Sequence, residues 1–125
     1  MKQYNYIICG AGCASLTFLY EILSLQNLQQ KSILLIDKKL IKENDRTWCF
    51  WEKEKNLFEN LVQHSWQKLK FDATNFTKVL NIEPYTYKQI RGVDFYNYII
   101  RFAKQFNNIF FFLLQFFVYR NIISI

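Results

Sequence analysis

The first forty residues alternate between short apolar runs and one helical pattern. Residues 3–9 form an apolar run with aromatic and β-branched side chains, which predicts a short buried strand. Residues 32–37 form a second such run, and it ends in the acidic residue Asp37. Between the two runs, apolar side chains recur at helical spacing and predict a helix from about 12 to 26: Leu16, Leu19, Tyr20 and Leu23. The order strand, helix, strand predicts an α/β fold.

The remaining pattern predicts a mixed region. A short helix is expected over 57–62, and strands are expected over 66–71, 77–82 and 85–90. A second helix is expected over 92–106, with a buried face made of Phe95, Ile99, Phe102 and Phe106. The apolar run 109–119 is shorter than the roughly 20 residues that a membrane-spanning helix needs.

A glycine turn joins the first strand to the first helix. Gly10 permits a tight turn, and Gly12 lets the backbone approach a pyrophosphate at the N-terminus of the helix. Ser15 stands where the dinucleotide fingerprint has its third glycine, a position at which a small side chain serves packing. Asp37 follows 25 residues after Gly12 and can accept hydrogen bonds from ribose hydroxyls. This order predicts a Rossmann-like start for binding FAD or NAD(P); a plain βαβ unit with a glycine turn is the alternative.

The segment 44–52 holds two of the three tryptophans, an acid–base pair and a thiol within nine residues. Its aromatic side chains could cover a flat ligand. On composition alone, an aromatic strand in a core is favoured, with Asp45 and Arg46 as a surface ion pair. His64 is interpreted as a structural or surface residue.

Composition and charge exclude several classes of function. With 51% hydrophobic residues the chain can bury a core, so general disorder is excluded. The net charge is +6, but the basic residues are scattered, so no nucleic-acid partner is expected. Three cysteines without a CxxC spacing, together with one His, predict no metal site, and we expect Cys9, Cys13 and Cys49 to be reduced core residues of a cytoplasmic protein. The apolar start lacks a clear cleavage site, so secretion is not expected.

Four blocks of sequence resemble the N-terminal part of a lycopene cyclase of the bacterial β-cyclase type: 8–16, 34–37, 44–52 and 84–96. The resemblance covers residues 1–108 and implies an FAD-binding fold similar to that of flavoprotein hydroxylases. The family continues with a strand after the second helix, so the resemblance also implies a strand in the first half of the run 109–119. It also implies a redox-neutral reaction in which the ends of lycopene close into β-ionone rings, with NAD(P)H as the reductant of the flavin. A water-insoluble substrate of this kind suggests contact with a membrane surface.

The resemblance also implies roles for individual residues. FAD would be held by a set from the glycine turn and the segment after it: Gly10, Gly12, Ala14, Ser15, Asp37 and Arg46. Three side chains would lie near the flavin or the substrate: Trp48, Trp51 and Arg91. Arg91 as a solvated charge at the entry of a helix is an equal alternative. The resemblance identifies no catalytic residue in this chain.

The family is longer than this chain, and its later acidic motif has no counterpart here. We therefore expect an incomplete flavoprotein-hydroxylase-like domain in 1–108, followed by an apolar tail in 109–125 from a truncated or frameshifted reading frame. On this view the chain is an inactive N-terminal fragment of a lycopene β-cyclase. A non-catalytic nucleotide-binding remnant and another FAD-dependent oxidoreductase are the alternatives.

Overall fold

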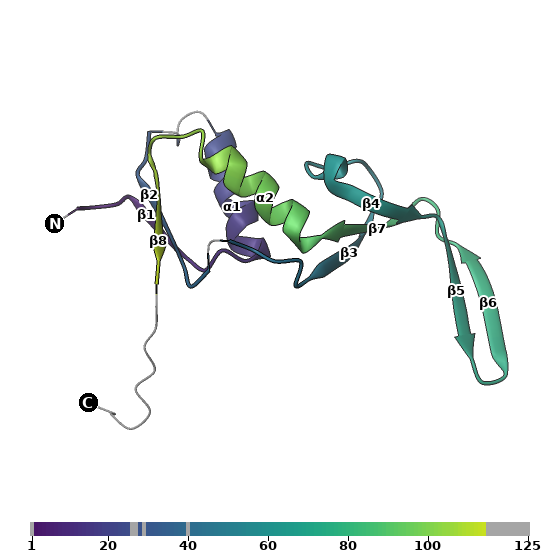
Figure 1. Cartoon of the computed structure of the whole chain (residues 1–125). Helices are drawn as coiled ribbons and strands as arrows, with labels where there is room; N and C mark the ends of the chain where they lie inside the picture. Colours follow the sequence, from purple (N-terminus) through teal and green to yellow (C-terminus); the bar gives the residue numbers. More distant parts are fainter. Residues whose placement is uncertain (1, 26–27, 29, 40, 115–125) are drawn as a thin grey trace, which may run out of the picture. The chain divides into compact units, whose positions relative to one another are not determined.

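The computed structural model describes residues 2–25, 28, 30–39 and 41–114 (Figure 1). The chain forms two compact units. The first draws on residues 1–41 and on the chain from Ile99 onward, and the second spans Lys42–Tyr98. Both units mix helix and strand, so the α/β class is confirmed.

The first unit contains a three-stranded parallel sheet. β1 (Tyr6–Cys9) leads through α1 (Cys13–Ser24) to β2 (Ile33–Asp37), and β8 (Ile109–Leu113) completes the sheet in the order β1-β2-β8. Ile8 pairs with Leu35, and Leu35 pairs with Phe111. The predicted strand–helix–strand order and the strand at the start of the apolar run are therefore confirmed. The rest of the expected tail, 115–125, lies outside the described residues, and the domain boundary at 108 stays a prediction.

One face of this sheet carries the core of the first unit. α1 lies along that face in Figure 1, and the largest fully buried side chains among the described residues gather here: Leu16, Leu19, Leu23, Ile33, Leu35 and Ile99. On the opposite face, Ile7 is 58% exposed and Phe112 is 50% exposed. The expectation of a buried first strand was therefore wrong except at Ile8, because successive strand residues point to opposite faces and only one face is covered.

The second unit is built around an antiparallel sheet in the order β3-β7-β4. Its strands are β3 (Thr47–Glu52), β4 (Val62–Trp66) and β7 (Thr86–Arg91), and a short 3-10 turn, Glu59–Leu61, precedes β4. A separate hairpin pairs β5 (Lys68–Ala73) with β6 (Phe76–Asn81), and Asn75 in its turn has a φ of 66°. The strand expected over 66–71 is confirmed from residue 68 onward and wrong at its start: Trp66 pairs with Tyr87 and ends β4, whereas Lys68 pairs with Asn81 and begins β5.

α2 (Gly92–Ala103) follows β7 without a loop and is three residues shorter than expected. Phe95 and Ile99 are buried, as predicted. Phe102 is only half-buried and Phe106 lies beyond the end of the helix, so the predicted buried face is right for its first half.

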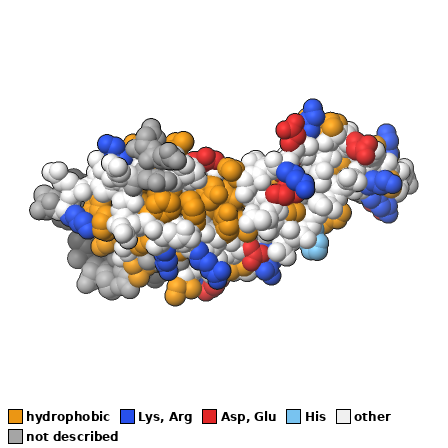
Figure 2. Space-filling model, turned by 90° about the horizontal axis from the view of Figure 1, so that it is seen from above, with side chains coloured by type: hydrophobic (Ala, Val, Ile, Leu, Met, Phe, Trp, Pro, Cys, Tyr) orange, Lys and Arg blue, Asp and Glu red, His pale blue; other side chains and the backbone are white. Residues whose placement is uncertain are grey.

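The exposure of the three cysteines differs from the prediction. Cys9, Cys13 and Cys49 are free thiols, but all three are exposed, so their assignment to the core was wrong. Cys9 and Cys49 lie on uncovered sheet faces, which a one-dimensional pattern does not distinguish from buried ones. On the face seen in Figure 2, basic side chains are interspersed with acidic ones. Among the described residues, no helix has the length and apolar character to cross a membrane.

Candidate functional site

The glycine turn between β1 and α1 has the backbone geometry that its sequence predicts. Gly10 has a φ of 89°, in the left-handed region that favours glycine, and its N–H donates to the carbonyl of Ile36 at 2.7 Å. This bond ties the turn to the C-terminal end of β2. Gly10 therefore has a reason within the chain to be glycine.

Gly12 has no such reason. Its φ of −87° is open to any residue, and a Cβ built on it would meet no atom within 4 Å. It is the N-cap of α1, and no side chain caps the helix there. The first intrahelical bond is donated by Leu16 to the carbonyl of Gly12, so the preceding N–H groups of the first turn have no partner within the helix. The space above Gly12 and the N-terminus of α1 is open to a ligand.

Asp37 lies at the same end of the sheet. Its carboxylate accepts a hydrogen bond from the N–H of Ala11 at 2.5 Å and another from the N–H of Lys39 at 2.8 Å. The glycine turn thus already presents an N–H to an anionic oxygen. A cavity of about 380 Å³ opens beside these groups, lined by Cys9, Gly10, Ile36, Asp37, Lys38 and Leu114. The predicted phosphate-binding turn and the predicted ribose-binding acid are therefore neighbours.

These features fit the adenosine diphosphate part of a dinucleotide. Pyrophosphate would take the N–H groups at the start of α1, where Ala14 and Ser15 lie in the first turn, and the helix dipole favours an anion at that end. The absence of a Cβ at Gly12 leaves room for close approach. Asp37 would accept hydrogen bonds from a ribose.

In the second unit, the segment 44–52 contains β3, so the aromatic-strand interpretation describes its conformation. Trp48 and Trp51 point to opposite faces of the sheet, because they are three positions apart in a strand. Trp48 packs edge-on against Phe95 at 5.1 Å and Tyr96 at 5.3 Å between ring centroids. Trp51 is 52% exposed. The two indoles therefore have different surroundings, one against α2 and one open to solvent.

The open face carries an aromatic row across three strands. Trp51, Tyr87 and Trp66 pair directly across β3, β7 and β4. Ring centroids are 4.9 Å apart for Trp51 and Tyr87 and 5.9 Å apart for Tyr87 and Trp66. His64 stacks on Trp66 at 5.8 Å and is exposed, as expected of a surface histidine. A hydrogen bond with Cys49 raises the pKa of the Tyr87 phenol, which keeps it neutral.

The two candidate arginines are paired with acids. Arg46 lies 3.8 Å from Asp45, and both side chains are more than half exposed, so the predicted surface ion pair is confirmed. Arg91 donates two hydrogen bonds to Asp94, at 2.7 and 2.9 Å, with its side chain 48% exposed. This is the arrangement expected of a solvated charge at the entry of α2.

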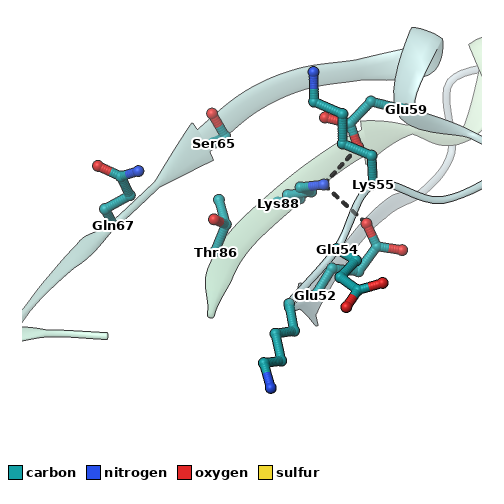
Figure 3. Close-up of a pocket in the computed structure, with 9 residues that line it drawn as sticks. Glu52, Glu54, Lys55, Glu59, Ser65, Gln67, Thr86 and Lys88 are labelled. Atoms are coloured by element: carbon teal, nitrogen blue, oxygen red, sulfur yellow. Dashed lines mark hydrogen bonds and ion pairs between the residues drawn. The ribbon is translucent and has the colours of Figure 1, made fainter. Parts of the chain in front are cut away.

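A buried ion cluster on the other face of the same sheet was not foreseen. The ammonium group of Lys88, 7% exposed, lies 2.9 Å from Glu52 and 2.5 Å from Glu59 (Figure 3). Burial alone lowers the pKa of Lys88, but the hydrogen bonds with Glu59 and Glu52 outweigh it and raise that pKa above its ordinary value. The cluster lines a cavity of about 510 Å³ whose wall also includes Ser65, Gln67 and Thr86.

Comparison with known proteins decides the family. Over residues 5–104, the chain matches the family described as lycopene cyclase protein. The chain belongs to the lycopene cyclase family. The resemblance carried by the four sequence blocks is thereby confirmed for the lycopene cyclase family, and with it a carotenoid cyclase type of function, whereas the β-cyclase type stays a prediction. A search among curated proteins finds no match to the chain.

The lycopene cyclase match includes both groups of candidate residues. Gly10, Gly12 and Asp37 are brought together in the first unit, and the aromatic residues and arginines belong to the second. Trp48 contributes to the packing of α2, and Trp51 heads the exposed row. Sequence reasoning missed Tyr87 and Lys88, whose partners in the structure lie far along the chain. A period-of-two reading of the segment 47–52 would have placed Trp48 and Trp51 on opposite faces of a strand, without showing which face is exposed.

Proposed function

We propose that this member of the lycopene cyclase family is of the β-cyclase type and binds FAD through the glycine turn. The β-cyclase type is supported by the resemblance of the four sequence blocks. The observation that carries the FAD part of the proposal is Gly12, which neither its backbone angles nor its neighbours require to be glycine. It lies within the lycopene cyclase match, at the uncapped N-terminus of a helix, near a carboxylate at the end of the adjacent strand. A ligand that comes close to the backbone explains all three features.

In this proposal the residues of the first unit bind and orient. N–H groups of Ala14 and Ser15 hold the pyrophosphate of FAD, and Asp37 accepts from the ribose. Gly10 sets the direction of the turn. When bound and reduced by NAD(P)H, the flavin supplies an electron-rich ring system beside a developing positive charge.

The proposed reaction is the redox-neutral closure of the ends of lycopene. A proton adds to a terminal double bond, the resulting carbocation is attacked by a neighbouring double bond, and a proton leaves to give the β-ionone ring. Electron-rich indole faces attract a cation through their π electrons, which suits Trp51 on the open face. Because the proposed substrate is insoluble in water, the proposal includes contact of the chain with a membrane surface.

Binding of FAD to the full chain tests the cofactor part. We expect the purified chain to retain FAD through gel filtration, and Gly12→Val to lower the affinity by about tenfold or more, since its side chain occupies the space a pyrophosphate needs. Ala73→Val, at an exposed position at the end of β5, is the matched control and should bind FAD as the wild type does. A wild-type chain without FAD, or equal binding by Gly12→Val, would refute the cofactor part.

Expression of the chain in a lycopene-accumulating bacterial host tests the catalytic part. β-Carotene or a one-ended cyclic product, detected by chromatography and absorbance, supports cyclase activity of the chain. FAD binding without any cyclic product would instead support the nucleotide-binding remnant. Oxidation of NAD(P)H with no change in lycopene would point to another FAD-dependent oxidoreductase.

A further inference from the structure

The aromatic row, defined as Trp51, Tyr87 and Trp66, is arranged as a continuous surface. The three residues are directly opposite one another on adjacent strands, so their rings follow the spacing of about 4.8 Å between strands. The row therefore extends for about 10 Å across the sheet. Neighbouring rings are tilted by 48° and 38° relative to one another.

The row is exposed where aromatic side chains of this size are ordinarily covered. Trp51 is 52% exposed and Trp66 is 39% exposed, whereas Trp48 on the opposite face packs against α2. An exposed group of large aromatics on one sheet face is typical of a binding surface. The row contributes little to the core of the second unit, so its side chains are available for a ligand.

Charge identifies the kind of ligand. The next row of the same face consists of Cys49, Gln89 and His64, so neither row contains Lys, Arg, Asp or Glu. The uncharged area is therefore two rows deep, and the row beyond it on the same face holds Thr47 and Arg91. An anionic lipid surface or a nucleic acid would be recognised by basic side chains. A neutral patch of ring faces suits an uncharged, flat, apolar ligand.

We propose that the aromatic row binds an elongated, uncharged, conjugated hydrocarbon chain laid across β3, β7 and β4, with Trp66 and Tyr87 as substrate-positioning residues beside Trp51. The inference rests on the proposed function, because the linear carotene of a cyclase is such a hydrocarbon. A straight conjugated chain contacts all three rings at once, which a compact ligand cannot do. The row sets where the chain lies and does not itself transfer the proton.

Retention of lycopene by the full chain tests the inference. The chain is mixed with lycopene in detergent micelles, separated by gel filtration, and assayed for visible absorbance per protein. The double variant Trp51→Ala/Trp66→Ala should retain about tenfold less lycopene, and Trp51→Phe/Trp66→Phe should recover most of the loss. The matched control is Phe71→Ala/Phe76→Ala on the hairpin of β5 and β6, where both side chains are also about half exposed; it should retain lycopene as the wild type does.

Three results would overturn the inference. The first is equal retention by Trp51→Ala/Trp66→Ala and the wild type, and the second is an equal loss in the Phe71→Ala/Phe76→Ala control. The third concerns phosphatidylcholine or phosphatidylglycerol vesicles that contain no lycopene. If Trp51→Ala/Trp66→Ala loses the ability to sediment with these vesicles, the row is a membrane contact. A chain that binds FAD and retains no lycopene overturns the inference alone, and one that retains lycopene on the row without binding FAD refutes the cofactor proposal alone.

Discussion

The N–H of Gly92 donates a hydrogen bond to the carbonyl of Arg46 at 2.7 Å, and a Cβ on Gly92 would lie 2.8 Å from that same oxygen. The contact joins the start of α2 to the residue before β3. A backbone oxygen cannot move aside as the end of a flexible side chain can. Glycine at position 92 is therefore required by the packing of the second unit, in contrast to Gly12.

Gly92→Ala should destabilise the second unit by about 2 kcal/mol, because the methyl group forces the chain at Arg46 to shift. Urea unfolding followed by tryptophan fluorescence measures this, since all three tryptophans belong to the second unit. Gly12→Ala, whose Cβ meets nothing within 4 Å, is the matched control, with circular dichroism as the readout. A stability loss in Gly12→Ala as large as that in Gly92→Ala would contradict this interpretation.

The two tryptophans of the 44–52 block should differ in their effect on stability. Trp48→Ala removes ring contacts with Phe95 and Tyr96 and should cost roughly 3 kcal/mol. Trp51→Ala changes a side chain that is 52% exposed and should cost less than about 1 kcal/mol. Denaturant unfolding followed by circular dichroism compares them. Equal losses would show that the two faces of β3 are not distinct in solution.

Lys88→Met should be strongly destabilising, because it leaves Glu52 and Glu59 without their buried counter-charge. Breaking a buried pair by removal of one partner costs about 3–5 kcal/mol. Because Glu59 is partly exposed, we expect a loss of unfolding free energy of about 3 kcal/mol. Lys70→Met is the matched control: Lys70 pairs with Asp72 at 2.7 Å, but both side chains are 59% exposed, so a change below about 0.5 kcal/mol is expected. Similar stabilities of the two variants would refute the role of burial.

The same cluster predicts a loss of stability in alkali. The pKa of Lys88 is raised in the folded chain by Glu59 and Glu52 despite the opposing effect of burial. Its stabilising contribution is therefore complete below the unfolded pKa of about 10.4 and is lost as the pH rises through the higher folded pKa. Unfolding curves between about pH 9 and 12 should show this loss in the wild type and in Lys70→Met, and a smaller one in Lys88→Met. An identical alkaline profile in all three would exclude Lys88 as its source.

The elements of the first unit could be predicted from local sequence. Gly10 and the helical spacing of Leu16, Leu19 and Leu23 lie within one short stretch of sequence, and Asp37 marks the end of its own apolar run. Their prediction is correct because a parallel βαβ unit places its turn, helix and acid in that order. The exposure of individual side chains was harder to predict, because Cys9 follows a buried neighbour and the pattern does not say which sheet face is covered.

The side-chain contacts and strand pairing of the second unit could not be predicted from local sequence patterns. Lys88 meets Glu52 and Glu59 across sequence separations of 36 and 29 residues, so no short window contains the cluster. The boundary between β4 and β5 depends on which strand each residue pairs with, and composition does not specify that pairing. The opposite orientation of Trp48 and Trp51 does follow from the sequence once 47–52 is accepted as a strand.

The pairing of β8 with β2 has a consequence for the order of assembly. Ile33 and Ile109 are neighbours in the sheet, and the whole second unit lies between them in the chain. During synthesis β1 and β2 can pair early, but the third strand becomes available only after the second unit has been made. This high contact order slows closure of the sheet, because a long loop must be closed before the contact is gained. The free edge of β2 is thus a transient template for other chains until Ile109–Leu113 arrive.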